Sequence, residues 1–255
     1  MNRKLWSYEE LVLAFNLYLK LPFGKMHKSN PDIMKLADLL NRTSSSIAMR
    51  LVNFASIDPY HQKRGVSGLS GGVKQCQPIW DEFINNRDEL FFESEKILAR
   101  FENQTIENKY STILYDINTI GEEKNREVKT RVNQNVFRQI ILNIYTTKCA
   151  ISGINIPDLL NASHIIPWSK NENERLNPSN GICLSKLYDA AFDKGLIGIK
   201  TDFSIILSSK LKEHRKDSYF EKQFGFLESC KLKLPERYQP KKEFLEYHLD
   251  TIFQS

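Results

Sequence analysis

One stretch of the chain, residues 159–195, constrains the fold more than any other: LLNASHIIPWSKNENERLNPSNGICLSKLYDAAFDKG. Its first ten residues predict a short strand, which Pro167 limits because proline cannot donate to a sheet. The polar segment SKNENERLNPSN predicts a loop, and GICL predicts a second strand. SKLYDAAFDKG then predicts a helix that ends at Gly195, a residue suited to a C-terminal cap. The stretch therefore predicts strand, loop, strand and helix in succession.

The same stretch carries residues suited to hydrolytic chemistry. Asp189 and Asp193 lie four residues apart, which places both carboxylates on one helix face, about 6 Å apart at their bases. Such a pair repels unless a cation lies between the two groups, and hard Mg²⁺ or Mn²⁺ suits carboxylate oxygens. His164 can take a proton from water at neutral pH. Alternatively, the acids occupy a solvated helix face and the histidine is an ordinary polar residue of a strand.

Composition sets broad limits on the class of protein. The 255 residues are enough for one large domain or two small ones, and the 41% hydrophobic content is enough for a packed core. The net charge of +5 and the pI near 8.9 are compatible with nucleic-acid binding, although many basic proteins bind nothing acidic.

Cysteines and hydropathy narrow the class further. The four cysteines form no C-x-x-C pair, which argues against a zinc knuckle and a disulfide framework. The N-terminus becomes acidic before any long apolar run, unlike a signal peptide, and no segment is apolar enough to span a bilayer. We therefore expect a cytoplasmic protein with no membrane partner.

The N-terminal ninety residues predict helices. Ser7 and Glu10 form a capping box before LVLAFNLYLK, Asn30 with Pro31 starts PDIMKLADLL, and Thr43 caps SSSIAMRLVNFA. The second and third of these helices, with a short turn between them, are typical of a helix-turn-helix.

The third helix carries small polar residues that can reach DNA. Its apolar residues share one face, whereas Ser45, Ser46, Arg50 and Asn53 are expected to project away from that face. Serine and asparagine can bond phosphates or base edges, and arginine can bind guanine or a phosphate. The alternative is a three-helix bundle with a solvated polar face. The candidate DNA-binding residues in this region are Arg42, Ser45, Ser46, Arg50 and Asn53.

The middle of the chain predicts a junction between two domains. Residues 64–74, rich in glycine, predict a flexible loop that lacks the ending of a P-loop. Residues 79–102 predict a helix, and the polar residues 103–126 predict a linker. Another helix is expected from residue 134. Arg131 and Arg138 lie one heptad apart and either face a phosphate backbone or are ordinary surface charges.

The order and spacing of four residues resemble the HNH nuclease family, in its restriction-endonuclease-like branch. These residues are His164 in ASHIIPWS, Asn180 in RLNPSNGICLS, and Asp189 and Asp193 in YDAAFDKGLI. The resemblance runs from about residue 127 to residue 210 and begins with RVNQNVFRQIILNIY. The first ninety residues and the tail PKKEFLEYHLDTIF also resemble regions of that branch.

The resemblance implies a ββα-metal motif that hydrolyses DNA. It implies that His164 is the general base, and that Asn180 pins the loop and orients that histidine. Asp189 and Asp193 match metal-ligand positions, and the ion expected is Mg²⁺, with Mn²⁺ or Ni²⁺ as alternatives. Ser163 occupies another ligand position, where its neutral hydroxyl makes a weak ligand, and Tyr188 stands where close relatives often carry histidine.

The paired cysteines of zinc-stabilised relatives are absent, so we expect no structural zinc and a core role for Cys149. Because one ββα unit cuts one strand, we also expect a homodimer.

The sequence as a whole predicts a mostly helical α+β chain. Residues 1–102 are expected to form a helix-turn-helix-like DNA-recognition domain, 103–126 a linker, and 127–255 the HNH nuclease domain with a C-terminal helical extension. The function expected is that of a restriction or phage-defence endonuclease. The alternative is a non-catalytic DNA-binding regulator or reader of modified DNA that retains the HNH fold.

Overall fold

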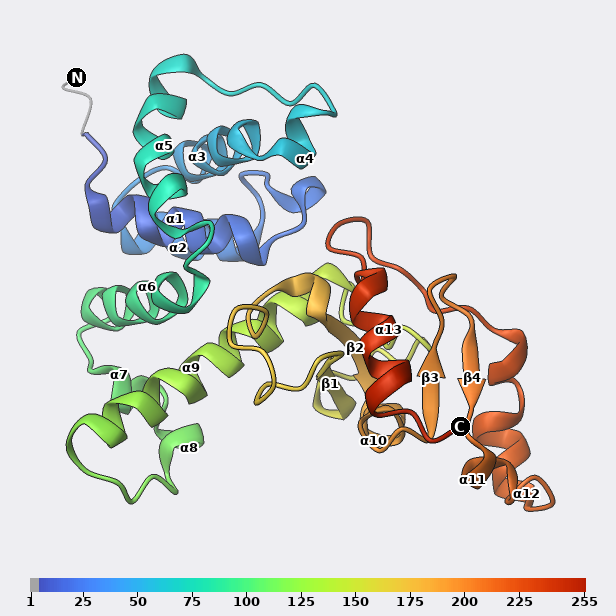
Figure 1. The fold of residues 1–255 in the computed structure, drawn as a ribbon. Coiled ribbons are helices and arrows are strands. Elements are labelled where there is room, and N and C mark those ends of the chain that lie inside the picture. The colour runs from blue at the N-terminus through green and yellow to red at the C-terminus, as the bar shows by residue number, and fades with distance from the viewer. Residues whose placement is uncertain (1–4) are drawn as a thin grey trace. The chain divides into compact units, whose positions relative to one another are not determined.

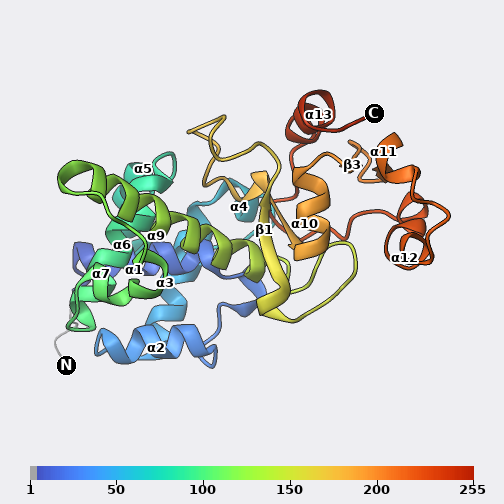
Figure 2. The ribbon, with the colours of Figure 1, turned by 90° about the horizontal axis from the view of Figure 1, so that it is seen from below.

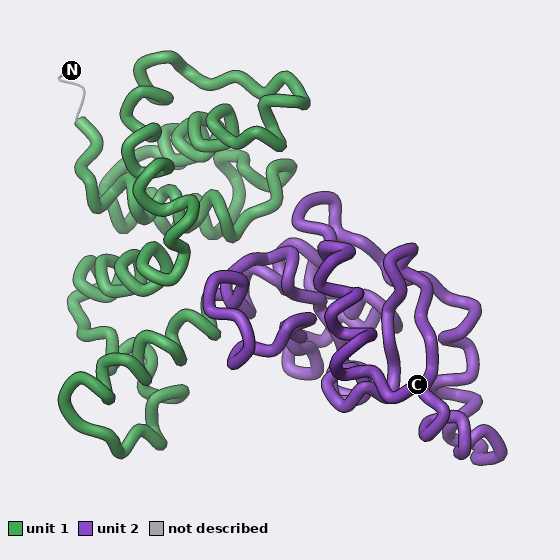
Figure 3. The backbone as a smooth tube through the Cα atoms, in the orientation of Figure 1, with its two compact units in different colours: residues 1–136 green, residues 137–255 purple. Residues whose placement is uncertain are grey.

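The computed structural model describes residues 5–255 and divides the chain into two compact units, residues 1–136 and 137–255 (Figure 3). The first unit is helical, and the second contains two small antiparallel sheets among helices (Figure 1). The chain therefore has the mostly helical α+β fold that the sequence predicts. The boundary between the units falls within one helix, α9 (Gly121–Ile144). Within residues 5–255, none of the helices has the length and apolar character that crossing a bilayer requires.

The first three helices begin where the sequence predicts. The Ser7 hydroxyl accepts a hydrogen bond from the Glu10 amide, and the Glu10 carboxylate accepts one from the Ser7 amide. Asn30 and Thr43 cap the next two helices through their side-chain oxygens. Packing of their apolar faces forms the core of the first unit. These helices are α1 (Tyr8–Lys20), α2 (Pro31–Leu39) and α3 (Ser44–Ile57), with a 3₁₀ turn η1 (Phe23–Lys25) and a short α4 (Pro59–Gln62).

The glycine-rich segment 64–74 is only partly a loop, because its second half opens helix α5 (Ser70–Phe83). Close packing explains this difference from the sequence prediction. A Cβ atom at Gly72 would collide with the Asn53 side chain, and one at Gly68 would lie 2.7 Å from the Asn53 Oδ1 atom. The glycines therefore allow α5 and the preceding loop to lie directly on α3, rather than conferring flexibility.

The predicted helix over residues 79–102 is two helices, because α5 ends at Phe83 and α6 (Arg87–Phe101) follows. The predicted linker 103–126 is also folded, as α7 (Ile106–Lys109), α8 (Ser111–Leu114) and the start of α9. Tyr110 packs with Val128 and Val132 in a small apolar cluster.

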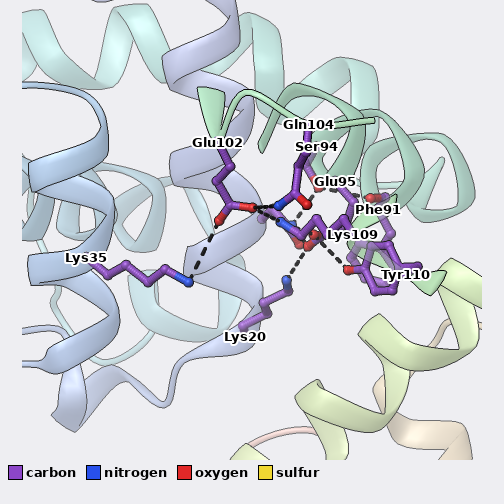
Figure 4. Close-up of polar contacts among 10 residues, drawn as sticks. Lys20, Lys35, Phe91, Ser94, Glu95, Glu102, Gln104, Lys109 and Tyr110 are labelled. Carbon is purple, nitrogen blue, oxygen red and sulfur yellow. Dashed lines mark hydrogen bonds and ion pairs between the residues drawn. The ribbon is translucent and has the colours of Figure 1, made fainter. Parts of the chain in front are cut away.

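A buried network attaches this folded segment to α1 and α6 (Figure 4). Glu95 is 2% exposed, accepts a hydrogen bond from the Tyr110 hydroxyl at 2.8 Å, and pairs with Lys20 and Lys109 at 2.7 and 3.4 Å. Burial raises the pKa of Glu95, but the two lysine charges and the hydrogen bonds outweigh it and lower the pKa to about 2. These contacts join residues that are far apart in the sequence. The local composition of residues 103–126 does not reveal them, and its polar character therefore predicted a linker.

In the second unit, β1 (Leu160–His164) pairs antiparallel with β2 (Gly181–Ser185), with His164 opposite Gly181. Helix α10 (Lys186–Asp193) follows β2 directly and packs beside this hairpin (Figures 1 and 2). Gly195 ends the helix with a φ of 65°, and a Cβ atom there would collide with the Ile252 carbonyl. The predicted order of strand, loop, strand and helix is thus observed.

The remaining strands and α-helices of the second unit follow α10 in the chain. Strand β3 pairs with β4, and α13 packs against β3. His248 of α13 stacks on Phe192 of α10, with ring centroids 3.7 Å apart. These elements are β3 (Ile197–Ile199), β4 (Ile205–Leu207), α11 (Ser209–Lys212), α12 (Ser218–Phe220) and α13 (Lys242–Thr251), with short turns η2 (Pro157–Leu159), η3 (Pro178–Asn180), η4 (Glu221–Gly225) and η5 (Leu227–Ser229).

Candidate active site

His164, at the end of β1, is held in one orientation by its surroundings. Its ring stacks on Phe137 of α9, with centroids 4.2 Å apart and planes at 13°, and meets Trp168 edge-on. The His164 Nε2 atom lies 2.9 Å from the backbone carbonyl oxygen of Arg175. A carbonyl oxygen only accepts, so Nε2 carries the proton and Nδ1 carries a lone pair.

Burial lowers the pKa of His164, while the Arg175 carbonyl and the negative charge of Asp189 oppose this shift. The net lowering favours the neutral imidazole at neutral pH, the form that can accept a proton. The Nδ1 atom forms no hydrogen bond with any residue from 5 to 255. His164 therefore has the protonation state and the available lone pair of a general base.

Asn180, which is 1% exposed, holds the loop between the two strands. Its side-chain oxygen accepts from the Ile166 amide at 2.8 Å. Its side-chain nitrogen donates to the Ile166 and Glu174 carbonyls, both at 3.1 Å. Glu174 precedes Arg175, so the bonds of Asn180 fix the segment that carries the acceptor for His164.

Asp189 and Asp193 form the acidic side of the site on α10. The side-chain nitrogen of Asn161, on β1, donates to the Asp189 Oδ2 atom at 2.6 Å, which fixes this carboxylate against the hairpin. Desolvation of the Asp193 carboxylate and the like charge of Asp189 raise the pKa of Asp193 to about 6, although the residue as a whole is exposed. The two carboxylates therefore repel each other, which is the situation that a bound cation relieves.

A divalent cation fits this pair of carboxylates. Mg²⁺ typically takes one or two protein carboxylates and completes its shell with water and substrate phosphate. Within residues 5–255, no group of three or more His, Cys, Asp or Glu side chains is placed to hold a metal ion. Asp189 and Asp193 would therefore be the protein's main anchors for the ion.

Ser163 and Tyr188, at two other candidate metal-ligand positions, have different surroundings. Ser163 is 2% exposed, and its hydroxyl oxygen is buried without a hydrogen-bond partner among the described residues. The Tyr188 hydroxyl donates to the Gln223 carbonyl at 2.8 Å, which gives that side chain a structural partner. Cys149 is fully buried, as expected for a core residue.

A family model described as HNH endonuclease matches residues 149–200. This part of the chain is an HNH endonuclease domain. The matched range contains both strands of the hairpin and all of α10, and with them His164, Asn180, Asp189 and Asp193. The HNH family predicted from the sequence is therefore confirmed for residues 149–200. No curated protein matches the chain.

Sequence reasoning missed three residues that complete the HNH site. Asn161 fixes Asp189, the Arg175 backbone sets the tautomer of His164, and Phe137 supports its ring. A side chain able to donate a hydrogen bond, on the strand that also carries His164, was the available signal for Asn161. The other two contribute a carbonyl and a ring face across the fold, and a local pattern does not reveal such contacts.

Outside the HNH domain, the structure corrects the expected orientation of Arg50 and Asn53, which were predicted to project from α3. Arg50 is 6% exposed and donates to the Gly72 carbonyl and the Gln75 side chain. Asn53 is 2% exposed and accepts from the Leu69 amide. Helix α5 and its preceding loop cover this face, so both residues connect α3 to α5.

The other residues predicted to contact DNA differ in whether their side chains are already bound to protein groups. Arg42 forms a two-pronged ion pair with the buried Glu10, with N···O distances of 2.9 and 2.7 Å. Arg131 pairs at the surface with Asp116. Arg138 donates to two backbone carbonyls that precede or open β1. Ser45 is exposed and Ser46 half-buried at the start of α3, so they retain access to a ligand.

Proposed function

We propose that the chain is a metal-dependent DNA endonuclease of restriction or phage-defence type. The observation that carries the proposal is the neutral His164, whose Nδ1 lone pair is left available by the bond between Nε2 and Arg175. The HNH domain supports nuclease activity in general. Asp189 and Asp193 supply the acidic side that such hydrolysis needs.

In the proposed reaction, the Nδ1 atom of His164 takes a proton from a water molecule. The resulting hydroxide attacks phosphorus in line with the P–O3′ bond, which breaks as the new P–O bond forms. The departing 3′ oxygen acquires a proton from solvent, so the products are a 5′ phosphate and a 3′ hydroxyl. Asn180 holds the loop that orients His164 throughout this sequence.

A divalent ion, with Mg²⁺ preferred and Mn²⁺ or Ni²⁺ as alternatives, would be held by Asp189 and Asp193. It would supply positive charge to stabilise the negative charge that builds on the phosphate. The bond from Asn161 leaves the other Asp189 oxygen without a hydrogen-bond partner among residues 5–255, which favours coordination by that atom.

We assign DNA recognition to the first unit, through a helix-turn-helix-like arrangement of α2 and α3. The exposed start of α3, with Ser45 and Ser46, supports this assignment. We further propose a homodimer, because one ββα unit cuts one strand and a double-strand break needs two. A light-scattering mass equal to one chain, with and without DNA, would contradict the dimer.

The limited ligand set favours a second candidate, a DNA-binding regulator or reader of modified DNA that no longer cleaves. The buried hydroxyl of Ser163 and the absence of a three-ligand cluster within residues 5–255 are the observations behind it. The intact geometry around His164 favours the enzyme instead.

Incubation of the purified protein with DNA distinguishes the two functions. The substrates are unmodified and base-modified plasmid and phage DNA, each tested with Mg²⁺, Mn²⁺, Ni²⁺ and a chelator. We expect metal-dependent cuts whose ends carry 5′ phosphate, as shown by ligation without prior phosphorylation. Binding of DNA without cleavage under every condition would favour the regulator.

A further inference from the structure

The first unit contains a cavity of about 720 Å³, far larger than a single ion requires. Its walls come from the starts of α3 and α5 and from the segment before α1. The size is in the range of pockets that hold small organic ligands. Ser45, Ser46, Arg50, Ser70, Gly71 and Gln75 contribute to its polar lining.

Arg50 brings an uncompensated positive charge to this cavity. Its guanidinium donates to the Gly72 carbonyl at 3.0 Å, the Gln75 side chain at 2.9 Å and the Cys76 sulfur at 3.6 Å, and lies over the Trp6 ring at 4.4 Å. These partners are neutral, and Arg50 forms no ion pair with any residue from 5 to 255. Arg42, in the same lining, is neutralised by Glu10.

A buried charge is costly unless an opposite charge accompanies it. With Arg50 only 6% exposed, an anion in the cavity would supply that opposite charge. The guanidinium has more N–H groups than its bonds to Gly72, Gln75 and Cys76 use, so it can donate to such an anion directly.

Two helix starts add to the preference for an anion. Helix α5 has 14 residues, and no side chain caps its first turn, so the N–H groups near Ser70 and Gly71 remain available. Ser45 and Ser46, at the start of α3, line the same cavity. Helix N-termini carry partial positive charge and commonly bind phosphate.

The rim of the cavity is apolar. Leu5, Met49 and Leu69 line it and are 79%, 41% and 53% exposed. We propose that this cavity binds a phosphate-bearing nucleotide, with the phosphate at Arg50 and the first turn of α5. The sugar and base then cover the apolar rim. This binding does not depend on turnover at the nuclease site.

Gly71 offers a clean test, since removing Arg50 would disturb the packing of α3 on α5. A Cβ atom at Gly71 would meet nothing within 4 Å, so Gly71→Glu adds a negative charge to the lining of the cavity without a clash at Cβ. Glutamate also favours the helix more than glycine. Gly24→Glu is the matched control, because Gly24 has equally open surroundings and lies outside the cavity. Gly71→Ala controls for loss of the glycine.

The measurement is titration calorimetry of the full chain in chelator, with inorganic phosphate, a deoxynucleoside monophosphate and a short single-stranded oligonucleotide. We expect the monophosphate or the oligonucleotide to bind at least about tenfold more tightly than phosphate. Gly71→Glu should weaken that binding by about tenfold or more, while Gly24→Glu and Gly71→Ala preserve it. Binding of the monophosphate identifies a free nucleotide as sufficient, and binding of the oligonucleotide alone identifies a DNA strand.

Three results would overturn the proposal: no binding of any ligand, equal effects of Gly71→Glu and Gly24→Glu, or phosphate binding as tightly as the nucleotides. Cleavage assays on the same variants separate this outcome from the proposed nuclease function. A protein that cuts DNA but binds no nucleotide in this cavity contradicts only the present inference.

Discussion

The Nε2 atom of His164 donates to the backbone carbonyl of Arg175 across 2.9 Å, and this one bond determines which ring nitrogen can act as a base. The carbonyl belongs to the loop between β1 and β2. Asn180 holds the same loop through Ile166 and Glu174. The reactivity of the imidazole therefore depends on the folding of a loop that contributes no side chain to proton transfer.

Asn180→Asp tests this dependence. An aspartate retains the acceptor for the Ile166 amide but replaces the donor to two carbonyls with an oxygen that repels them. We expect a stability loss of about 2 kcal/mol and, from the displaced base, a fall in kcat of about tenfold or more. Thermal unfolding and single-turnover cleavage measure the two effects.

The matched control is Asn171→Asp, in the same loop. Asn171 uses its side-chain oxygen to accept from the Asn173 amide, a role that aspartate keeps. This variant should cut DNA at the wild-type rate. Full activity of Asn180→Asp would show that the loop does not need its asparagine to orient His164.

Asp193→Asn tests the acidic pair. Asp189 and Asp193 repel each other, as the raised pKa of Asp193 indicates, so the neutral amide should leave the metal-free protein as stable or slightly more stable. Added Mn²⁺ should raise the Tm of the wild type by linkage and leave that of Asp193→Asn unchanged.

Asp158→Asn, which neutralises an exposed acid outside α10, should keep the wild-type response to Mn²⁺. The same Mn²⁺-induced rise in Tm for Asp193→Asn and the wild type would exclude Asp193 as an anchor.

The HNH hairpin and α10 could be predicted because their signals are local. The four site residues lie within one continuous stretch of strand, loop, strand and helix. They are His164, Asn180, Asp189 and Asp193. Proline and glycine mark its turns, and the helical period places both aspartates on one face. Packing elsewhere in the chain did not have to be known for this part of the prediction.

The sequence predictions that were wrong concern contacts between segments far apart in the chain. Arg50 and Asn53 have the residue types and spacing of a solvated helix face, but the α5 segment buries both residues. Gly68 and Gly72 allow this segment to approach Asn53 closely. From composition alone, the same glycines predicted a flexible loop. Tyr110 likewise lies in a polar stretch, and its bond to Glu95 and its packing with Val128 and Val132 show that the stretch belongs to the folded unit.

Glu95→Gln tests the buried network of the first unit. The substitution leaves Lys20 and Lys109 beside a neutral group, and we expect a stability loss of about 3 kcal/mol. Glu93→Gln is the control on the same helix, because its surface pair with Lys96 contributes at most about 1 kcal/mol. Chemical denaturation of both variants measures the difference.

The pH dependence of stability follows from the sign of the Glu95 shift. Its folded pKa of about 2 lies below its ordinary value of 4.5, so its contribution is fully present above pH 4.5. That contribution is lost as pH falls from 4.5 toward 2 and should be missing from Glu95→Gln. Parallel losses of stability in the wild type and Glu95→Gln over this window would contradict the assignment.

The role of His164 as the general base is tested most directly by the cleavage rate of His164→Ala in Mg²⁺ or Mn²⁺, with DNA binding measured in parallel. His214→Ala serves as the control, because His214 is exposed and pairs only with Asp217 among the described residues. We predict that His164→Ala lowers kcat by about 100-fold or more while binding DNA as the wild type does. Cleavage by His164→Ala at the wild-type rate would contradict the assignment of His164 as the general base.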